Sequence, residues 1–484
     1  MSPKSSRREF LQATAACGAL WFVAAGCGPK GGLVREAAAA ATAASTKVIS
    51  PGCRKSKVQV AKLYLGKPQA HWPTPKLDLA DEMKSYEADF ARMKNEFADV
   101  QFAVNELVTS EDQARALKDK LQNVDGILAI HLSMGAAGML KEILAAGRPT
   151  MLFAAPYSGH EWTGFGQLRT KPQGALLDCL LTSDRRQLAA AVRPFRAIHH
   201  LREAKILDVT THDVSAYARQ MKNKFGTEIV QVPRARVLEA YNAVPEADAA
   251  AEARKWIDGA QKVVEPSREE IVKSLRLALA FENLLDAENA TLITVDCYGS
   301  MWRQLPAYPC IGFARLNGIG LGGMCESDLP SSMTQILLQG LSGKPGFITD
   351  PTMDVSKGGI ILAHCMGTPQ MDGPDGPVAP YRLRTIMERQ EGAVCQVFMR
   401  IGQKVTQAEL IGTTQVRFFT GEVIETPDLP RGCRTKITVK VDGNVQKLWQ
   451  NWSDGLHRVT CYGDLREDLA RFCRFKGLEL VDEA

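Results

Sequence analysis

GILAIHL, residues 126–132, decides the fold class of this chain. A continuous apolar run of this length is typical of a strand that is buried on both faces of a parallel sheet. Strand patterns at 58–65 and 100–107 precede it, another follows at 149–155, and stretches of helical periodicity separate them. This β-α-β-α-β alternation predicts a parallel sheet with helices on both of its faces.

A second unit with the same alternation follows. Its strands are expected at 204–209 and 291–295, and its helices at 214–225, 249–260, 268–285 and 329–341. After about residue 345 the helical periodicity nearly disappears. Short β-branched or alternating runs replace it, at 359–364, 394–401, 407–411, 415–420, 436–441 and 445–449. The chain is therefore predicted to be an α/β protein, with two doubly wound parallel-sheet domains followed by a β-rich domain. A last helix is expected at 464–475.

The N-terminus has the form of an export signal rather than of a folded element. Residues 6–12 read SRREFLQ, and paired arginines followed by two apolar residues are what the twin-arginine translocase reads. The apolar run at 13–25 is shorter than the about 20 residues that a membrane-spanning helix needs. AAGC at 24–27 resembles a lipobox, so Cys27 is either a lipid anchor or an unmodified residue. We expect an exported protein, periplasmic or anchored to the membrane facing outward.

These patterns divide the chain into five parts. They are a signal at 1–27, an Ala-rich linker at 28–57, an α/β domain at 58–180, a second α/β domain at 181–345 and a β-rich domain at 346–484.

Composition narrows the class of protein. The 484 residues are 45% hydrophobic and 23% charged, which is ordinary for a globular protein. The net charge of +5 comes with no basic stripe interleaved with aromatic residues, so we expect no nucleic-acid partner. The twelve cysteines form no C-x-x-C motif. Because twin-arginine substrates fold in the reducing cytoplasm, we expect most cysteines to be buried thiols, with one or two disulfides at most.

Three segments carry residues suited to chemistry. GGMCESD at 322–328 places Glu326 and a second acid after two glycines and directly before a helix, where a carboxylate also serves as a helix cap. PGFITD at 345–350 ends an apolar strand in Asp350, 24 residues after Glu326 (350 minus 326). Ligands bind at the carboxyl ends of parallel strands, although an acid there is also a common turn residue. His457 in GLHRVT and His364 in AHCMG are candidate ligands or structural histidines.

Taken in order, these residues resemble the L-fucose isomerase family of sugar isomerases. The likeness is clearest from residue 297 onward, and FARLN at 313–317 and LQGLSGKP at 338–345 carry much of it. The resemblance implies that the β-rich domain is barrel-like. It also implies that Glu326, Asp350 and His457 bind Mn²⁺ or another divalent cation such as Mg²⁺, that Glu326 and Asp350 are catalytic, and that the protein is a homo-oligomer with a monosaccharide substrate.

The residue types suit that chemistry. Interconverting an aldose and a ketose moves a proton between two adjacent carbons through an enediolate, which a divalent cation stabilises while a carboxylate transfers the proton. Carboxylates with one imidazole favour Mn²⁺ or Mg²⁺ over the metals that prefer thiolates. Two alternatives stay open: an exported, non-catalytic sugar-binding protein that keeps this fold, and a surface protein of another role. The sequence does not identify the sugar or say which carboxylate is the acid and which the base.

Overall fold

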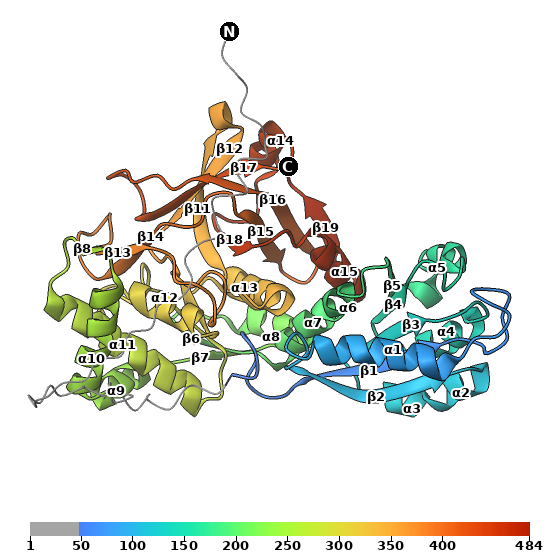
Figure 1. Ribbon diagram of the computed structural model, residues 1–484. Helices are drawn as coiled ribbons and strands as arrows, with labels where there is room; N and C mark the ends of the chain where they lie inside the picture. Colours follow the sequence, from blue (N-terminus) through green and yellow to red (C-terminus); the bar gives the residue numbers. More distant parts are fainter. Residues whose placement is uncertain (1–47) are drawn as a thin grey trace, which may run out of the picture. The chain divides into compact units, whose positions relative to one another are not determined.

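The computed structural model describes residues 48–484 (Figure 1). The predicted twin-arginine signal, Cys27 and the linker up to residue 47 lie outside the described residues. The end of that linker, from 48 to 57, contacts the second α/β unit: the Gly52 N–H donates to the Gly320 carbonyl at 2.8 Å, and Arg54 pairs with Asp286. No helix among residues 48–484 is long and apolar enough to cross a membrane.

The first sheet is parallel throughout, in the order β2-β1-β3-β4-β5. Its strands are β1 Val58–Leu65, β2 Val100–Val108, β3 Gly126–His131, β4 Thr150–Ala154 and β5 Leu177–Leu181. Every residue of β3 is buried, as the run at 126–132 predicts. Leu63 of β1 packs in one cluster with α4 (Ala137–Leu144), and Tyr64 packs in another with α1 (Leu79–Arg92). Helices therefore cover both faces of this sheet.

The second sheet is also parallel, in the order β10-β9-β6-β7. Its strands are β6 Lys205–Val209, β7 Glu228–Gln231, β9 Leu292–Val295 and β10 Gly322–Cys325. The sequence patterns did not predict β10 as a strand. Its glycines are needed for packing, because a Cβ on Gly323 would lie 2.5 Å from the Cα of Phe313 in α12 (Cys310–Gly318). This close approach places α12 directly against the strand that leads to Glu326.

The C-terminal region is a closed antiparallel barrel of six strands, in the order β15-β18-β11-β12-β17-β16, which β16 closes by pairing with β15. The strands are β11 Phe347–Asp354, β12 Gly359–His364, β15 Lys404–Ile411, β16 Gln415–Glu425, β17 Thr435–Val441 and β18 Arg458–Tyr462. β19 (Glu479–Asp482) follows α15 (Arg466–Lys476) and pairs in parallel with β16. An α/β protein with a β-rich C-terminal region is thus confirmed.

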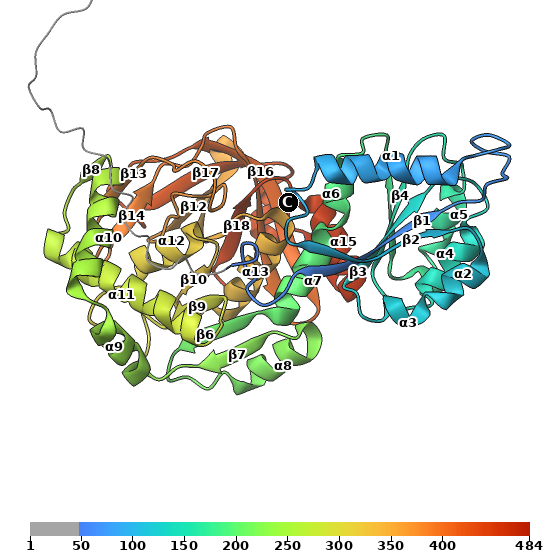
Figure 2. The same cartoon turned by 60° about the horizontal axis from the view of Figure 1, so that its bottom comes forward.

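The barrel and the second sheet share one core. Helix α13 (Leu329–Ser342) is buried almost along its whole length and packs against β10, β15 and β18 (Figure 2). A small sheet adds a second connection: β8 (Lys262–Val263) pairs with β13 (Tyr381–Arg384), which pairs with β14 (Val394–Val397). The end of β10 and one end of the barrel therefore face each other across the N-terminus of α13.

Two sequence predictions are wrong in detail. The run at 445–449, expected as a strand, is the helix α14 (Val445–Asn451), because the Asn444 side chain caps it by accepting the N–H groups of Gln446 and Lys447. Asp350 does not end a parallel strand: it lies within β11 and pairs with Ala363 of the antiparallel barrel. Its position is therefore set by the barrel and not by an α/β sheet.

Candidate functional site

The segment between β10 and α13 has a strained backbone. Glu326 and Ser327 have φ values of 62° and 53°, in the left-handed region that non-glycine residues rarely adopt. Such conformations cost on the order of 1–3 kcal/mol each and gather at functional sites. The Ser327 hydroxyl donates to Oδ1 of Asp208, at the end of β6, at 2.6 Å. Asp328 caps α13 by accepting the N–H of Ser331 at 2.9 Å. The cap is therefore Asp328, which leaves Glu326 without that structural role.

His457, directly before β18, lies between two carboxylates. Its Nδ1 is 2.9 Å from Oδ2 of Asp328, and its Nε2 is 3.1 Å from Oδ1 of Asp350. The side chain is 10% exposed. Burial opposes the charged ring, but the hydrogen bonds to Asp328 and Asp350 outweigh it and raise the pKa of His457 to about 10. Burial likewise opposes ionisation of Asp350, but the His457 hydrogen bond holds the pKa of that carboxyl below its ordinary value.

Glu326 lies beside this pair. Its Oε1 is 4.0 Å from Nε2 of His364, the last residue of β12, and its side chain is 34% exposed. Burial raises the pKa of Glu326; the charge of His457 opposes that rise and the charge of Asp350 adds to it. The two predicted catalytic carboxyls thus have pKa values shifted in opposite directions, which is the arrangement that separates an acid–base group from a fixed anion.

His364 connects the predicted site residues. Its ligand nitrogens lie within 4.8 Å of donor atoms of Asp350 and His457 in one group, and of Cys325 and Glu326 in another. The ring is 4% exposed, and burial lowers its pKa to about 4, so it is neutral at pH 7. Its Nδ1 is buried without a hydrogen-bond partner in the described part of the chain. The structure therefore brings Asp350 and His457 into contact. Glu326 shares a group of ligand atoms with His364 and Cys325, and not with Asp350 and His457.

These residues suit a divalent cation. Nδ1 of His457 faces the Asp328 carboxylate. When the ring gives up its Nε2 proton to a metal ion, the Nδ1 proton stays in that hydrogen bond and Nε2 becomes the ligand, an arrangement typical of metal-bound histidines. Two ligands of one ion at about 2.1 Å and a right angle lie about 3 Å apart, close to the 3.1 Å between Nε2 of His457 and Asp350. Two carboxylates and one imidazole match the oxygen-rich sites of Mn²⁺ and Mg²⁺.

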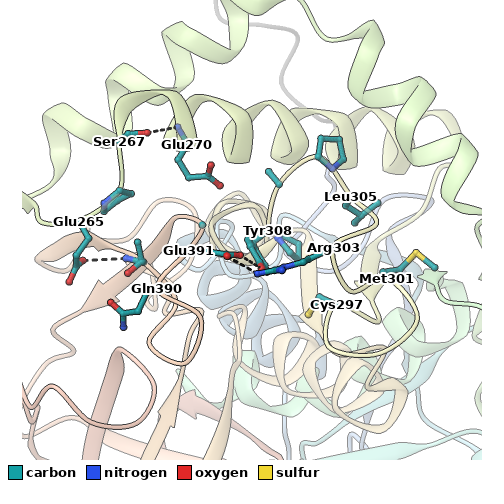
Figure 3. Close-up of a pocket in the computed structure, with 16 residues that line it drawn as sticks. Glu265, Ser267, Glu270, Cys297, Met301, Arg303, Leu305, Tyr308, Gln390 and Glu391 are labelled. Carbon is teal, nitrogen blue, oxygen red and sulfur yellow. Dashed lines mark hydrogen bonds and ion pairs between the residues drawn. The ribbon is translucent and has the colours of Figure 1, made fainter.

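A separate cavity of about 510 Å³ is lined by residues that include Arg303, Tyr308 and Glu391 (Figure 3). The Glu391 carboxylate within it accepts hydrogen bonds from Arg303 at 2.7 Å and from the Tyr308 hydroxyl at 2.6 Å. Cys297 lines the cavity, and its Sγ is 3.2 Å from Sγ of Cys325, the residue before Glu326. The residues around the cavity do not include Glu326, Asp350 or His457. Within residues 48–484 we take the carboxylate–histidine cluster as the candidate metal centre, because its side chains lie at ligand distances in addition to having a left-handed turn and shifted pKa values.

Sequence reasoning missed Asp208 and Asp296, which lie at the carboxyl edge of the second sheet beside the Glu326 turn. Asp296 follows β9, and its carboxylate accepts the Ser300 N–H at 2.7 Å. Burial raises the pKa of Asp208 to about 6. The sequence did hold a sign of them. Asp208 and Asp296 lie at the ends of the strands predicted at 204–209 and 291–295, and acids at the ends of neighbouring parallel strands meet at one edge of the sheet.

Comparison with known proteins adds no family to this geometry. No protein-family model matches the chain, and no curated protein matches it.

Proposed function

We propose that this protein is a metal-dependent aldose–ketose isomerase that acts on a monosaccharide through an enediolate. The observation that carries the proposal is the position of His457, fixed by Asp328 on one nitrogen and 3.1 Å from Asp350 on the other, beside the strained carboxylate Glu326. Glu326, Asp350 and His457 are the proposed ligands of Mn²⁺ or another divalent cation such as Mg²⁺. Such a cation, when bound, stabilises the negative charge that develops on the two sugar oxygens.

The two carboxylates have different roles in this proposal. Glu326, with its raised pKa, removes a proton from one carbon of the sugar and returns it to the neighbouring carbon. Asp350, with its lowered pKa, stays ionised throughout and keeps the His457 ring in place. His364 is neutral, so it adds no charge that would compete with a cation beside Glu326.

The experiment that tests this function is a screen for aldose–ketose interconversion on a panel of monosaccharides, with Mn²⁺, with Mg²⁺ and with chelator. We expect metal-dependent formation of a ketose from at least one aldose, and exchange of the migrating hydrogen with solvent deuterium. Absence of both on every sugar that binds to the protein would contradict the proposal.

The second candidate is an exported, non-catalytic sugar-binding protein with the same fold. The cavity favours it, because Arg303, Tyr308 and Glu391 form a hydrogen-bonded polar group there, outside the carboxylate–histidine cluster. The sugar affinity of two variants and the release of a ketose distinguish the two functions. A binding protein loses sugar affinity in Arg303→Ala and keeps it in Glu326→Gln, and it never releases a ketose.

The proposal includes the cellular location and assembly expected from the sequence. We propose export by the twin-arginine route to the periplasm or to an outward-facing membrane anchor at Cys27, and a homo-oligomeric state. Mass spectrometry of the mature N-terminus distinguishes a lipid on Cys27 from its absence.

A further inference from the structure

A second group of potential ligands lies next to Asp350, outside the proposed isomerase chemistry. Cys365 directly follows β12, and Cys433 lies two residues before β17; these two strands pair side by side (Figure 1). Glu388 comes from the loop between β13 and β14. Sγ of Cys365 is 3.8 Å from Sγ of Cys433, and the Glu388 carboxylate is 3.6 Å from Cys365 and 3.4 Å from Cys433.

These distances match the coordination of a tetrahedral ion. With metal–sulfur bonds of about 2.3 Å and a metal–oxygen bond of about 2.0–2.2 Å, two sulfur ligands lie about 3.8 Å apart and sulfur and oxygen about 3.5 Å apart. The backbone already brings two cysteines and one carboxylate to those separations. Ligand donors of all three residues lie within 4.8 Å of one another.

The three side chains are also free to bind an ion, because they make few hydrogen bonds outside the group. Within residues 48–484, their side-chain hydrogen bonds outside the group are two: Glu388 with the Tyr298 hydroxyl at 3.5 Å, and Cys433 with Oδ2 of Asp350 at 3.8 Å. Cys365 is 4% exposed, whereas Glu388 is exposed and leaves a path from solvent. An ion would therefore displace no strong hydrogen bond.

Another group with similar residue types is already hydrogen-bonded to the rest of the protein. Cys53, His199 and Glu203 also lie within 4.8 Å of one another. His199, however, already bonds Asp125 through Nδ1 at 2.8 Å and the Ser56 carbonyl through Nε2 at 2.9 Å. Glu203 accepts both the N–H and the hydroxyl of Ser56. That group is satisfied by the protein itself, so it does not need an ion.

We propose that Cys365, Cys433 and Glu388 form a second cation site, selective for a thiophilic divalent ion such as Zn²⁺. Asp350 provides the fourth ligand through Oδ2, while its Oδ1 remains directed at His457. On binding, the two thiols become thiolates and release about two protons for each ion bound. One carboxylate then serves two cations of different preference: an oxygen-preferring ion at Glu326 and His457, and a sulfur-preferring ion at the cysteines.

The test uses the full chain, reduced and freed of metal, with Co²⁺ and Zn²⁺ alone as probes. Thiolate ligation gives a sulfur-to-cobalt charge-transfer band, which carboxylate and imidazole ligands do not give. We expect this band in the wild-type protein, its displacement by Zn²⁺, and its loss in Cys433→Ser. Glu388→Gln, an exposed change that leaves the fold intact, is expected to weaken Zn²⁺ binding by roughly tenfold or more, since loss of outer partners alone costs 10–100-fold.

Two controls separate this site from the proposed isomerase site. Cys179→Ser removes a partly exposed thiol of β5 and should keep the band. Glu326→Gln disables the proposed isomerase site and should also keep it, whether or not the protein is an isomerase. The proposal is overturned if the reduced wild type shows no band, if Cys433→Ser and Glu388→Gln bind Zn²⁺ like the wild type, or if Cys365 and Cys433 are found as a disulfide that binds no Zn²⁺ after reduction.

Discussion

Nδ1 of His457 lies 2.9 Å from Oδ2 of Asp328, although 129 residues separate them in the sequence. The same aspartate caps α13 through its Oδ1. One side chain therefore fixes both the start of a buried helix and the orientation of the imidazole that faces Asp350. Asp328 therefore contributes to both the helix cap and the candidate metal site. Substitutions that keep the cap but remove the charge separate these two roles.

Asp328→Asn tests that link. Asparagine caps helices as well as aspartate does, so we expect the fold to be kept. The imidazole loses its charged partner, and Mn²⁺ affinity should fall by about 10–100-fold. Calorimetric titration with Mn²⁺ measures the affinity, and circular dichroism measures the fold. Asp78→Asn, the same change at the cap of α1, is the matched control and should leave Mn²⁺ affinity unchanged. Equal affinity in both variants would show that Asp328 is a cap only.

Glu326→Gln tests the proton-transfer role. The change keeps the shape of the side chain but removes the base, so isomerase activity should fall by on the order of 10²-fold or more. The rate is measured on the sugar that the interconversion screen identifies. Glu106→Gln, on the first sheet and far along the chain from the site, is the control and should turn over normally. Near-wild-type turnover in a folded Glu326→Gln protein would favour the sugar-binding alternative.

The left-handed backbone at Glu326 gives a prediction about stability. Glycine adopts a φ of 62° freely, whereas alanine does not, so Glu326→Gly should be more stable than Glu326→Ala by about 1 kcal/mol. Chemical denaturation measures the difference in free energy of unfolding. At Glu106, which has an ordinary negative φ within β2, the order should be reversed. If alanine is the more stable residue at both positions, the turn at Glu326 is not strained.

Asp208 makes the stability of the fold depend on pH. Burial raises its folded pKa from 3.8 to about 6, and its Oδ2 has no partner among the described residues. Between pH 4 and pH 6 the folded state keeps this proton while the unfolded state loses it, so rising pH destabilises the protein through this group. Asp208→Asn removes that loss and still accepts the Ser327 hydroxyl.

We therefore expect Asp208→Asn to gain on the order of 1–3 kcal/mol over the wild type between pH 4 and pH 7. Urea denaturation at both pH values measures the change in the difference between the two proteins. The exposed Asp464→Asn should show no such gain. A difference that is the same at pH 4 and at pH 7 would mean that folding does not raise the pKa of Asp208.

Local hydrophobic pattern was enough to predict the elements whose apolar residues can be buried in only one way. The run at 126–132 is apolar throughout, and only a strand covered on both faces buries all of it, as β3 does. The run at 359–364 is β12 to the residue, and one of the two acids after β10, Asp328, is the cap of α13. Where a short run carries a competing signal, local pattern is not enough: Asn444 caps 445–451 as a helix, although its β-branched start resembles a strand.

Which candidate residues meet depends on how the strands pair and how the helices pack on them. His457, Asp328 and Asp350 come from three separate segments, and sequence spacing says nothing of their contact. The antiparallel pairing of β11 with β18, with Thr349 opposite Arg458, brings Asp350 beside His457, and the packing of α13 on β18 adds Asp328. Cys365 and Cys433 meet through the pairing of β12 with β17, and Glu388 joins them from the loop between β13 and β14; the three residues form no motif along the chain. The reason is physical: a hydrophobic pattern reports which face of an element is buried, whereas the partner across that face depends on the packing of the whole core.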